Sequence, residues 1–326
     1  MNKKIWQAAC IVFAVAIVVL LALTASNFLK KPEEAAAPAA QSGWTAQTEI
    51  KTNALSEQLG AITANNMKGV TYPEGIPESL KALYAANKNT VARLAIPGTE
   101  IDTVIVQAKD NSHYLTYDFY ERYTTETSSL NYGNLYLDYR CNGDGSLSKN
   151  MVIHGHTTGR LAGIPKQSFR SLYDFRSKDT FKSSPIIRLT TLKGEYTYKI
   201  CAVFYSTTEP SADNGYFFNY IYPDMSDSNM IGYIEQVKQR ALYETGVSLE
   251  PTDKVITLST CIYDYGKNVD TRLVVVGRLL HEGEDESVDT SAVKDNPDYR
   301  RPQIWYNANG KTNPYKNAAK WEPSPN

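Results

Sequence analysis

The chain of 326 residues is poor in cysteine and histidine, with four of each. The cysteines form no CxxC pair and no dense group, so neither a zinc knuckle nor a disulfide framework is indicated, and each thiol has to be judged singly. An excess of basic residues is also absent, because 34 Lys and Arg stand against 35 Asp and Glu. The chain therefore lacks the charge that phosphate backbones attract, and we expect no nucleic-acid partner.

Low hydrophobicity combined with high net charge, the mark of a disordered chain, is absent too. Hydrophobic residues make up 42% of the sequence and charged residues 21%, as in ordinary globular proteins. The length allows one or two folded domains.

A long apolar run occurs once, from Ile5 to Leu23, where Gln7 is the only polar residue. These 19 residues, at ~1.5 Å each in a helix, cover the ~30 Å hydrocarbon core of a bilayer. The run predicts one membrane-spanning helix within an N-terminal segment 1–29. A cleaved secretory signal peptide is the alternative, since the small residues from Ala22 to Ser26 could form a cleavage site. Everything after residue 30 is expected on one side of the membrane.

Changes in composition along the chain predict the remaining divisions. Residues 30–48, rich in Pro and Ala, suit a stalk that holds a domain away from a surface. Two helical stretches are expected at about 45–66 and 77–89, within a folded domain that covers 49–281. The acidic stretch that opens 282–326 predicts a solvated linker, followed by an aromatic tail.

Short β-branched and aromatic runs, separated by Gly, Pro, Asn and Asp, fill the middle of the chain. Eight such runs in one domain favour a mainly β fold, a closed eight-stranded barrel, over a helical or parallel α/β fold. One helix interrupts them between the sixth and seventh runs, from Ser226 to Thr245, and we expect it to cap the barrel. The runs are VARLAI, TVIVQ, GNLYLDY, NMVIHG, IIRLTTL, EYTYKICAVFYS, KVITLSTC and TRLVVVGRLL.

The run that ends in Cys261 carries the sharpest candidate for chemistry. Alternate residues of a strand share a face, so Ser259 and Cys261 point together while Thr260 points the other way. Cys261 is also the last residue before a polar loop, whereas Cys201 lies inside an apolar run and is expected to be a small buried hydrophobe. A thiol with a pKa of ~8.5 is mostly protonated at neutral pH, so a nucleophilic Cys261 needs a nearby cation or base.

His154 and His156 end a strand-like run and, being two positions apart, project from one face. A base for Cys261 is one interpretation of this pair, and a metal site is the other. A zinc hydrolase of the HxHxDH type would need Asp and His next, where Thr158 and Gly159 stand, and no further histidine cluster supplies ligands. We therefore expect no metal, and nothing in the sequence calls for another cofactor.

Arg272 opens the run after Cys261, following a connection of ten residues. If the two strands pair antiparallel, Cys261 and Arg272 face each other at the loop end. A guanidinium there could hold a substrate carbonyl, donate to an oxyanion and favour the thiolate. Arg278 shares the face but lies ~20 Å further along, so Arg272 is the better candidate. The candidate substrate-binding residues are neighbours of Cys261, namely Ser259, Thr260 and Tyr263.

Taken in order, these motifs resemble those of class B sortases, the membrane-anchored cysteine transpeptidases of Gram-positive bacteria. The resemblance covers about residues 77–281 and rests on NKNTVARLAIPGTEID, GNLYLDYRC, VIHGHT with the following FRSLYDF, GEYTYKICAVF, VITLSTC and TRLVVVGRLL. It implies a sortase-type barrel with helices before it, Cys261 as the nucleophile, His156 as the acid/base and Arg272 as the clamp for substrate and oxyanion. His154 stands where the family usually has an aromatic residue.

The resemblance also implies a two-step exchange at the outer face of a cell membrane. The Cys261 thiolate would attack a Thr carbonyl in the C-terminal sorting signal of a surface protein, and an amine of a peptidoglycan precursor or a pilin would then resolve the thioester. A single-pass anchor over residues 5–23 would hold the catalytic domain on the extracellular side. Two other functions fit the same residues: a thiol peptidase that only hydrolyses, and a non-catalytic cell-surface protein that binds peptides.

Overall fold

The computed structural model describes residues 54–125, 132–157, 169–265 and 269–324. The expected membrane-spanning run over 5–23 and the stalk over 30–48 lie outside these residues. Among the helices of the described part, none is both long and apolar enough to cross a bilayer.

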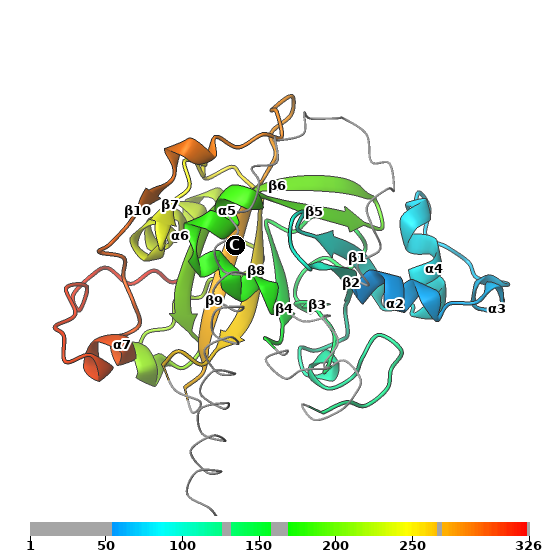
Figure 1. Ribbon diagram of the computed structural model, residues 1–326, viewed down its shortest axis with the longest axis horizontal. Coiled ribbons are helices and arrows are strands. Elements are labelled where there is room, and N and C mark those ends of the chain that lie inside the picture. The colour runs from blue at the N-terminus through cyan, green and yellow to red at the C-terminus, as the bar shows by residue number, and fades with distance from the viewer. Residues whose placement is uncertain (1–53, 126–131, 158–168, 266–268, 325–326) are drawn as a thin grey trace, which may run out of the picture. The chain divides into compact units, whose positions relative to one another are not determined.

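The predicted runs form eight strands: β1 Thr90–Ala95, β2 Asp102–Val106, β3 Tyr136–Leu137, β4 Asn150–Gly155, β5 Ile186–Thr191, β6 Gly194–Thr207, β8 Val255–Ile262 and β9 Thr271–Leu279. They close into a barrel in the order β1-β2-β3-β4-β8-β9-β6-β5, with β1 paired to β5 (Figure 1). Most neighbours are antiparallel, but β2 with β3 and β4 with β8 are parallel. The prediction of a closed eight-stranded barrel is confirmed.

The barrel is held together by the side chains that point into it. Ile256 and Leu258 of β8 are fully buried there, as are Leu273 and Val275 of β9. These positions follow from the two-residue period of a strand with aliphatic residues at every second place. Burial of each such side chain contributes about 1.5–3 kcal/mol, so the core fixes the register of the strands.

Three short helices precede the barrel; the first and third pack beside β2 and β1, and the second packs against the third. They are α2 Ala54–Gly60, α3 Ala64–Met67 and α4 Glu78–Ala86. α4 begins directly after Pro77, and its buried leucines share a hydrophobic cluster with two valines of β2. The helix predicted at 77–89 is confirmed, whereas the described part of 45–66 forms two short helices.

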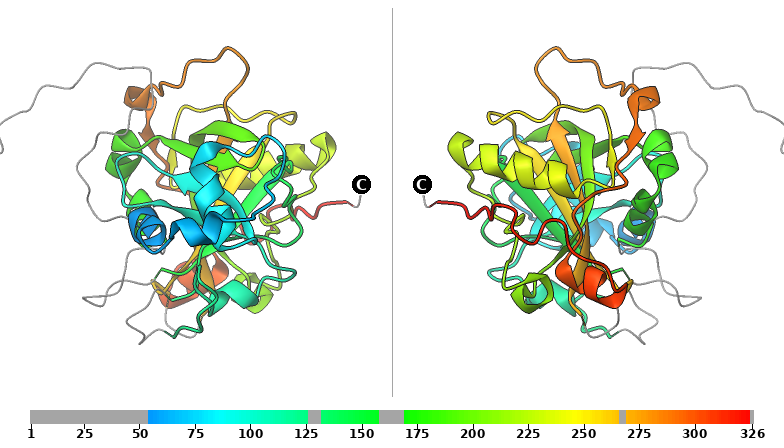
Figure 2. Two further views of the ribbon diagram at one scale, coloured as in Figure 1. Left: turned by 90° about the vertical axis from the view of Figure 1, so that its right-hand side faces the viewer. Right: turned by 90° about the vertical axis from the view of Figure 1, so that its left-hand side faces the viewer.

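Helix α6, Asp227–Arg240, lies between the sixth and seventh barrel strands, as predicted. Ser226 caps its N-terminus by accepting the backbone N–H of Asn229. The helix ends before the predicted Thr245, because Tyr243–Glu244 form the short strand β7. The helix α6, which we expected to cap the barrel, covers it from the side. It runs along the outer face of β6 and β9 (Figure 2). Met230 and Tyr233 of α6 share a hydrophobic cluster there with Phe204 of β6 and Val274 of β9.

The acidic segment after the barrel, which we predicted to be a solvated linker, is exposed or half-exposed throughout, and two of its carboxylates bind cations of the barrel. Glu284 forms ion pairs with Arg278 at 2.6 Å and Lys199 at 2.8 Å, and Glu286 pairs with Arg188 at 2.7 Å. Hydrogen bonds from Arg278, together with those from Lys199, hold the pKa of Glu284 well below its usual range. Glu284 and Glu286 are thus bound to cations of β9, β6 and β5.

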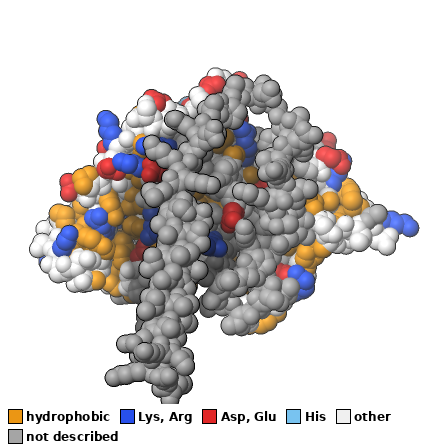
Figure 3. All heavy atoms as spheres, in the orientation of Figure 1, with side chains coloured by type: hydrophobic (Ala, Val, Ile, Leu, Met, Phe, Trp, Pro, Cys, Tyr) orange, Lys and Arg blue, Asp and Glu red, His pale blue; other side chains and the backbone are white. Residues whose placement is uncertain are grey.

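The remaining elements are short. The strand β10, Lys294–Asp295, pairs antiparallel with β7. The others are η1 His113–Leu115, η2 Ser171–Arg176, α5 Lys178–Ser183, η3 Pro210–Asp213, η4 Thr290–Ala292 and α7 Gln303–Ala308. On the face shown in Figure 3, cationic and anionic side chains are interspersed, as expected for a chain of nearly balanced charge.

We expect Glu284→Gln to lower the free energy of unfolding at pH 7 by about 2 kcal/mol, because the nearly buried Arg278 loses its carboxylate. The folded state lowers the pKa of Glu284, so its stabilising effect is present above the unfolded pKa of ~4.3 and is lost as the pH falls below that value. Urea unfolding at pH 7 and pH 3 measures the effect, and the difference from wild type should be smaller at pH 3.

Glu282→Gln is the matched control, since it makes the same change at an exposed position two residues earlier. It should unfold like wild type at both pH values. An equal loss of stability in the two variants would contradict the role given to Glu284.

Candidate active site

Cys261 and Arg272 face each other across two neighbouring strands. β8 and β9 pair antiparallel, and Cys261 is the Cα partner of Arg272 in their register. Both residues lie at the ends of their strands, where a short connection joins β8 to β9. The predicted juxtaposition is confirmed, and its cause is that short connection, which brings consecutive strands together as an antiparallel pair.

His156 follows the strand on the other side of Cys261. β4 pairs with β8 in parallel, and Gly155 is the Cα partner of Thr260. The residues that follow this pair are His156 after β4 and Cys261 in β8. The adjacent strands β4, β8 and β9 thus bring the three candidate residues to one end of the barrel. A Cβ at Gly155 would lie 2.0 Å from Cδ2 of Leu135, so only glycine allows β4 this close approach to the core.

The ring of His156 is oriented by the backbone of a distant loop. Its Nε2 lies 2.8 Å from the carbonyl oxygen of Leu115, so Nε2–H donates there. Tyr132 stacks on the ring, with 4.2 Å between the ring centroids and 14° between the planes. A neutral His156 held in this way has Nδ1 as the nitrogen that accepts and returns a proton.

His154 has different surroundings, although it shares a face with His156. Its Nε2 lies 3.0 Å from Oδ2 of Asp138, and Arg140 donates two hydrogen bonds of 2.8 Å to the same carboxylate. Burial acts to raise the pKa of Asp138, but the bonds from Arg140 and His154 outweigh it, so this pKa lies below its usual range. Asp138 is therefore an anion at neutral pH, and it holds the ring of His154.

The guanidinium of Arg272 bonds within the β8–β9 connection. Nη1 donates to Asp270 and, at 3.2 Å, to the carbonyl of Thr271. A fifth of the side chain is exposed. The positive charge of Arg272 also acts on Tyr136 and Tyr220. Burial raises the pKa of both phenols, and the charge of Arg272 opposes that rise. Asp270 thus orients the fork of Arg272, which has further donors to offer an oxyanion.

Thr157 ties the segment of His156 to the backbone of Cys261. Its hydroxyl donates to the carbonyl of Cys261 and lies 2.5 Å from the hydroxyl of Thr260. Thr260 in turn donates to the carbonyl of Gly155 at 2.8 Å. Sequence reasoning missed Thr157; a hydroxyl residue directly after the HGH motif is the signal that could have drawn attention to it.

The three predicted substrate-binding residues differ in exposure. Ser259 is buried, with its hydroxyl 2.9 Å from that of Tyr220, and Thr260 is buried as well. The side chains of these two residues are therefore closed to solvent, and they contact the protein around the strand. Tyr263, which follows β8, is 56% exposed and has the room to contact a substrate.

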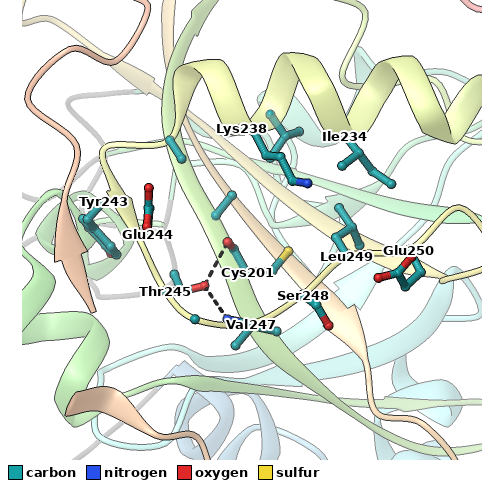
Figure 4. A pocket seen from close by; sticks show the side chains of 14 residues that line it. Cys201, Ile234, Lys238, Tyr243, Glu244, Thr245, Val247, Ser248, Leu249 and Glu250 are labelled. Atoms are coloured by element: carbon teal, nitrogen blue, oxygen red, sulfur yellow. Dashed lines mark hydrogen bonds between the residues drawn. The ribbon is translucent and has the colours of Figure 1, made fainter. Parts of the chain in front are cut away.

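The other two cysteines of the described residues, Cys141 and Cys201, have thiols that pack inside the protein. Burial raises the pKa of Cys201 to about 12, and it does the same for Cys141. Cys201 donates from Sγ to the carbonyl of Val276 at 3.4 Å and faces a cavity of about 330 Å³ between β6, α6 and residues 243–250 (Figure 4). This cavity lies about 16 Å along β6 from Ser206, the partner of Arg272, so it is separate from the site around Cys261.

The HxH pair is bound to protein groups. As described above, the two imidazoles meet a carboxylate and a backbone carbonyl. Across residues 54–324, leaving out the three undescribed gaps, no group of three or more His, Cys, Asp or Glu side chains is placed to hold a metal ion.

Comparison with known proteins points to one family. A model of the sortase domain matches residues 94–280, which is more than half of the chain. A protein named sortase B from Listeria monocytogenes is 28% identical over 245 residues, covering 73% of this chain and 91% of that protein. Sortase B from Staphylococcus aureus is 24% identical over 210 residues, covering 64% of this chain and 78% of that protein.

Solved structures share the barrel. A crystal structure from Bacillus anthracis, described as similar to sortase B, superposes with a TM-score of 0.53 at 25% identity, covering 69% of this chain and 92% of that one. A Staphylococcus aureus sortase B–substrate complex also gives a TM-score of 0.53, at 24% identity, covering 64% of this chain and 87% of the other. The second likeness supports the fold alone.

We expect Thr157→Val to lower the free energy of unfolding by about 1–2 kcal/mol, because the variant keeps the shape but removes the donor to the Cys261 carbonyl. Thr157→Ser keeps the hydroxyl and should retain most of that stability. Urea unfolding of the three proteins measures the difference. If Ser were as damaging as Val, the methyl group and not the hydroxyl would be responsible.

Proposed function

The chain belongs to the sortase family, a family of cysteine transpeptidases, and from this we propose that it cleaves the C-terminal sorting signal of surface proteins and transfers them to an amine of the cell wall. Sortases in general act on substrates that carry sorting signals. The observation that carries the proposal is the register of β8 and β9, which sets Cys261 opposite Arg272. His156 directly follows β4, the other neighbour of β8.

In the first step the thiolate of Cys261 attacks the carbonyl carbon of a Thr in the sorting signal, and Arg272 donates to the oxygen that becomes an anion. The C–N bond then breaks, and His156 gives its proton to the leaving amine. The product is a thioester between the surface protein and Cys261.

In the second step an amine of the cell wall attacks the thioester carbonyl. His156 takes a proton from this amine, the C–S bond breaks, and a new amide remains on the surface protein. Atoms and charges balance over the two steps, because the proton that His156 gives in the first returns in the second.

The partners follow from this chemistry. The acceptor is an amine of a peptidoglycan precursor or of a pilin subunit, and one solved sortase B structure is a complex with triglycine, a short peptide with such an amine. Tyr263 is proposed to contact the sorting peptide, since it is exposed next to Cys261. Residues 5–23 are proposed to anchor the protein in the cell membrane, with the catalytic domain on the extracellular side.

The proposal is tested with full-length protein and a pool of quenched fluorogenic pentapeptides that share a fixed Thr. With triglycine present, mass spectrometry should show peptides extended by triglycine. Cys261→Ala should abolish the product, whereas Cys201→Ala should leave it, because only the first thiol faces Arg272. Hydrolysis alone in the presence of triglycine would favour a thiol peptidase, and a wild-type protein as inert as Cys261→Ala would favour a binding protein.

The two histidines should differ in their effect on the rate. We expect His156→Ala to reduce kcat/KM by more than ~10²-fold, the usual contribution of general acid–base catalysis, because His156 is the histidine beside Cys261. His154→Ala should reduce kcat/KM by less, since the imidazole of His154 is hydrogen-bonded to the carboxylate of Asp138. Steady-state kinetics on the peptide pool decides, and a larger loss in His154→Ala would reverse the assignment.

A further inference from the structure

Trp321 anchors the C-terminal part of the chain to α6. Its side chain is 9% exposed, and its Nε1–H donates to the carbonyl of Asn229 at 3.0 Å. Its backbone N–H donates to the hydroxyl of Tyr216, which donates in turn to the carbonyl of Trp321, both at 2.9 Å. The rings of Phe218 and Tyr233 meet the indole edge to face, at 5.7 and 5.8 Å between centroids. The indole is thus held on several sides.

The seat of Trp321 depends on a glycine inside α6. A Cβ at Gly232 would lie 2.2 Å from Cδ1 of Trp321, so the indole occupies the space that any other side chain would fill. Glycine inside a helix costs about 1 kcal/mol relative to alanine. Alanine at this position would stabilise helix α6 itself but displace the indole of Trp321. The substitution therefore tests the seating of Trp321 without weakening the helix.

A series of contacts leads from Trp321 to the strand of Cys261. The ring of Phe218 lies 6.1 Å from that of Tyr220, whose hydroxyl is 2.9 Å from Oγ of Ser259. Ser259 is two residues before Cys261 and shares its face. Trp321 therefore supports, from outside, the β6–α6 connection that covers the strand of the nucleophile.

A second group of contacts reaches the β8–β9 connection. Tyr299 packs beside Tyr205, with 6.3 Å between ring centroids, and Tyr205 makes an edge contact with Tyr265 at 5.7 Å. Arg301 covers the ring of Tyr299 at 3.6 Å. Tyr265 follows Cys261 by four residues, so these rings support the loop that leaves the nucleophile.

Between these two groups the chain binds η3. Asp213 accepts the backbone N–H of Gln303 at 2.9 Å, and its other oxygen lies 3.9 Å from the guanidinium of Arg300. Asn214 donates to Oε1 of Gln303 at 2.8 Å. η3 comes shortly after the end of β6 that pairs with Arg272.

We propose that residues 299–324, the C-terminal strap, are a positioning element for substrate binding at the site of Cys261, a role that rests on the proposed transpeptidase function. The sortase model matches the chain up to residue 280, so the strap lies outside the matched domain. The β6–α6 connection holds only the short η3, and its shape therefore depends on what packs against it. Release of the strap loosens the β6–α6 connection and the β8–β9 connection, which carries Tyr263, the residue proposed to contact the peptide, and it leaves the thiol chemistry in place.

The test compares two variants that release the strap, Gly232→Ala and Trp321→Ala, with a matched control. Gly60→Ala is that control, because it makes the same change in helix α2 where a Cβ would meet nothing within 4 Å. Kinetics on the fluorogenic peptide pool with triglycine give kcat and KM. Alkylation by iodoacetamide, mapped by mass spectrometry to Cys261, gives the reactivity of the thiol.

Both strap variants should raise KM about tenfold, which corresponds to ~1.4 kcal/mol of binding. Their kcat and their alkylation rate should stay within about twofold of wild type, the pattern of lost binding with intact chemistry. The Gly60→Ala control should match wild type in all three quantities.

An unchanged KM, with limited proteolysis showing that the strap is released, overturns the proposal. A joint fall in kcat and in alkylation also overturns it, because the strap would then shape the nucleophile itself. If Gly232→Ala does not fold, Trp321→Ala decides alone, since it removes a ring and introduces no clash. A wild-type protein that makes no transfer product contradicts the proposed function, and the strap's role with it, before any variant is compared.

Discussion

The position of β8 between β4 and β9 is the constraint on which the site depends. Its backbone pairs in parallel with one neighbour and antiparallel with the other. The two ladders set the Cα partners, so Cys261 receives Arg272 from one side and His156 from the other. A slip of one residue would turn Cys261 into the barrel and Leu258 out of it, so the hydrophobic core protects the arrangement of the site.

The difference between local and distant contacts explains how much of the site could be predicted. Strand alternation and a short connection were enough to place Cys261 opposite Arg272, and the eight β-branched runs were enough to predict the barrel. The contacts that orient the site join distant segments: His156 and Leu115 are 41 positions apart in the sequence, and Thr157 and Cys261 are 104 positions apart. Neither periodicity nor composition tells which distant loop returns to a given strand.

The inability of local sequence patterns to identify distant contacts also explains where the sequence-based predictions differ from the structure. Composition counts the carboxylates of the acidic segment but not their partners, and the cations that bind Glu284 and Glu286 are spread over β5, β6 and β9. Alternation placed Ser259 on the face of Cys261, but only the folded β6–α6 connection shows that Tyr220 covers it. Helix α6 was found from its apolar stripe, whereas the surface that receives the stripe, the outside of β6 and β9, is a property of the whole barrel.

The parallel pairing of β4 with β8 also bears on the order of folding. β5, β6 and α6 all lie between these strands in the sequence, so the pairing closes a very long loop. Closing such a loop has a large entropy cost, and contacts of this range form late and slowly. Until β8 pairs with β4, Cys261 lacks His156 beside it, although the local pairing of β8 with β9 can already set Arg272 opposite. A chain that stalls before the barrel closes therefore exposes Cys261 with its candidate site incomplete.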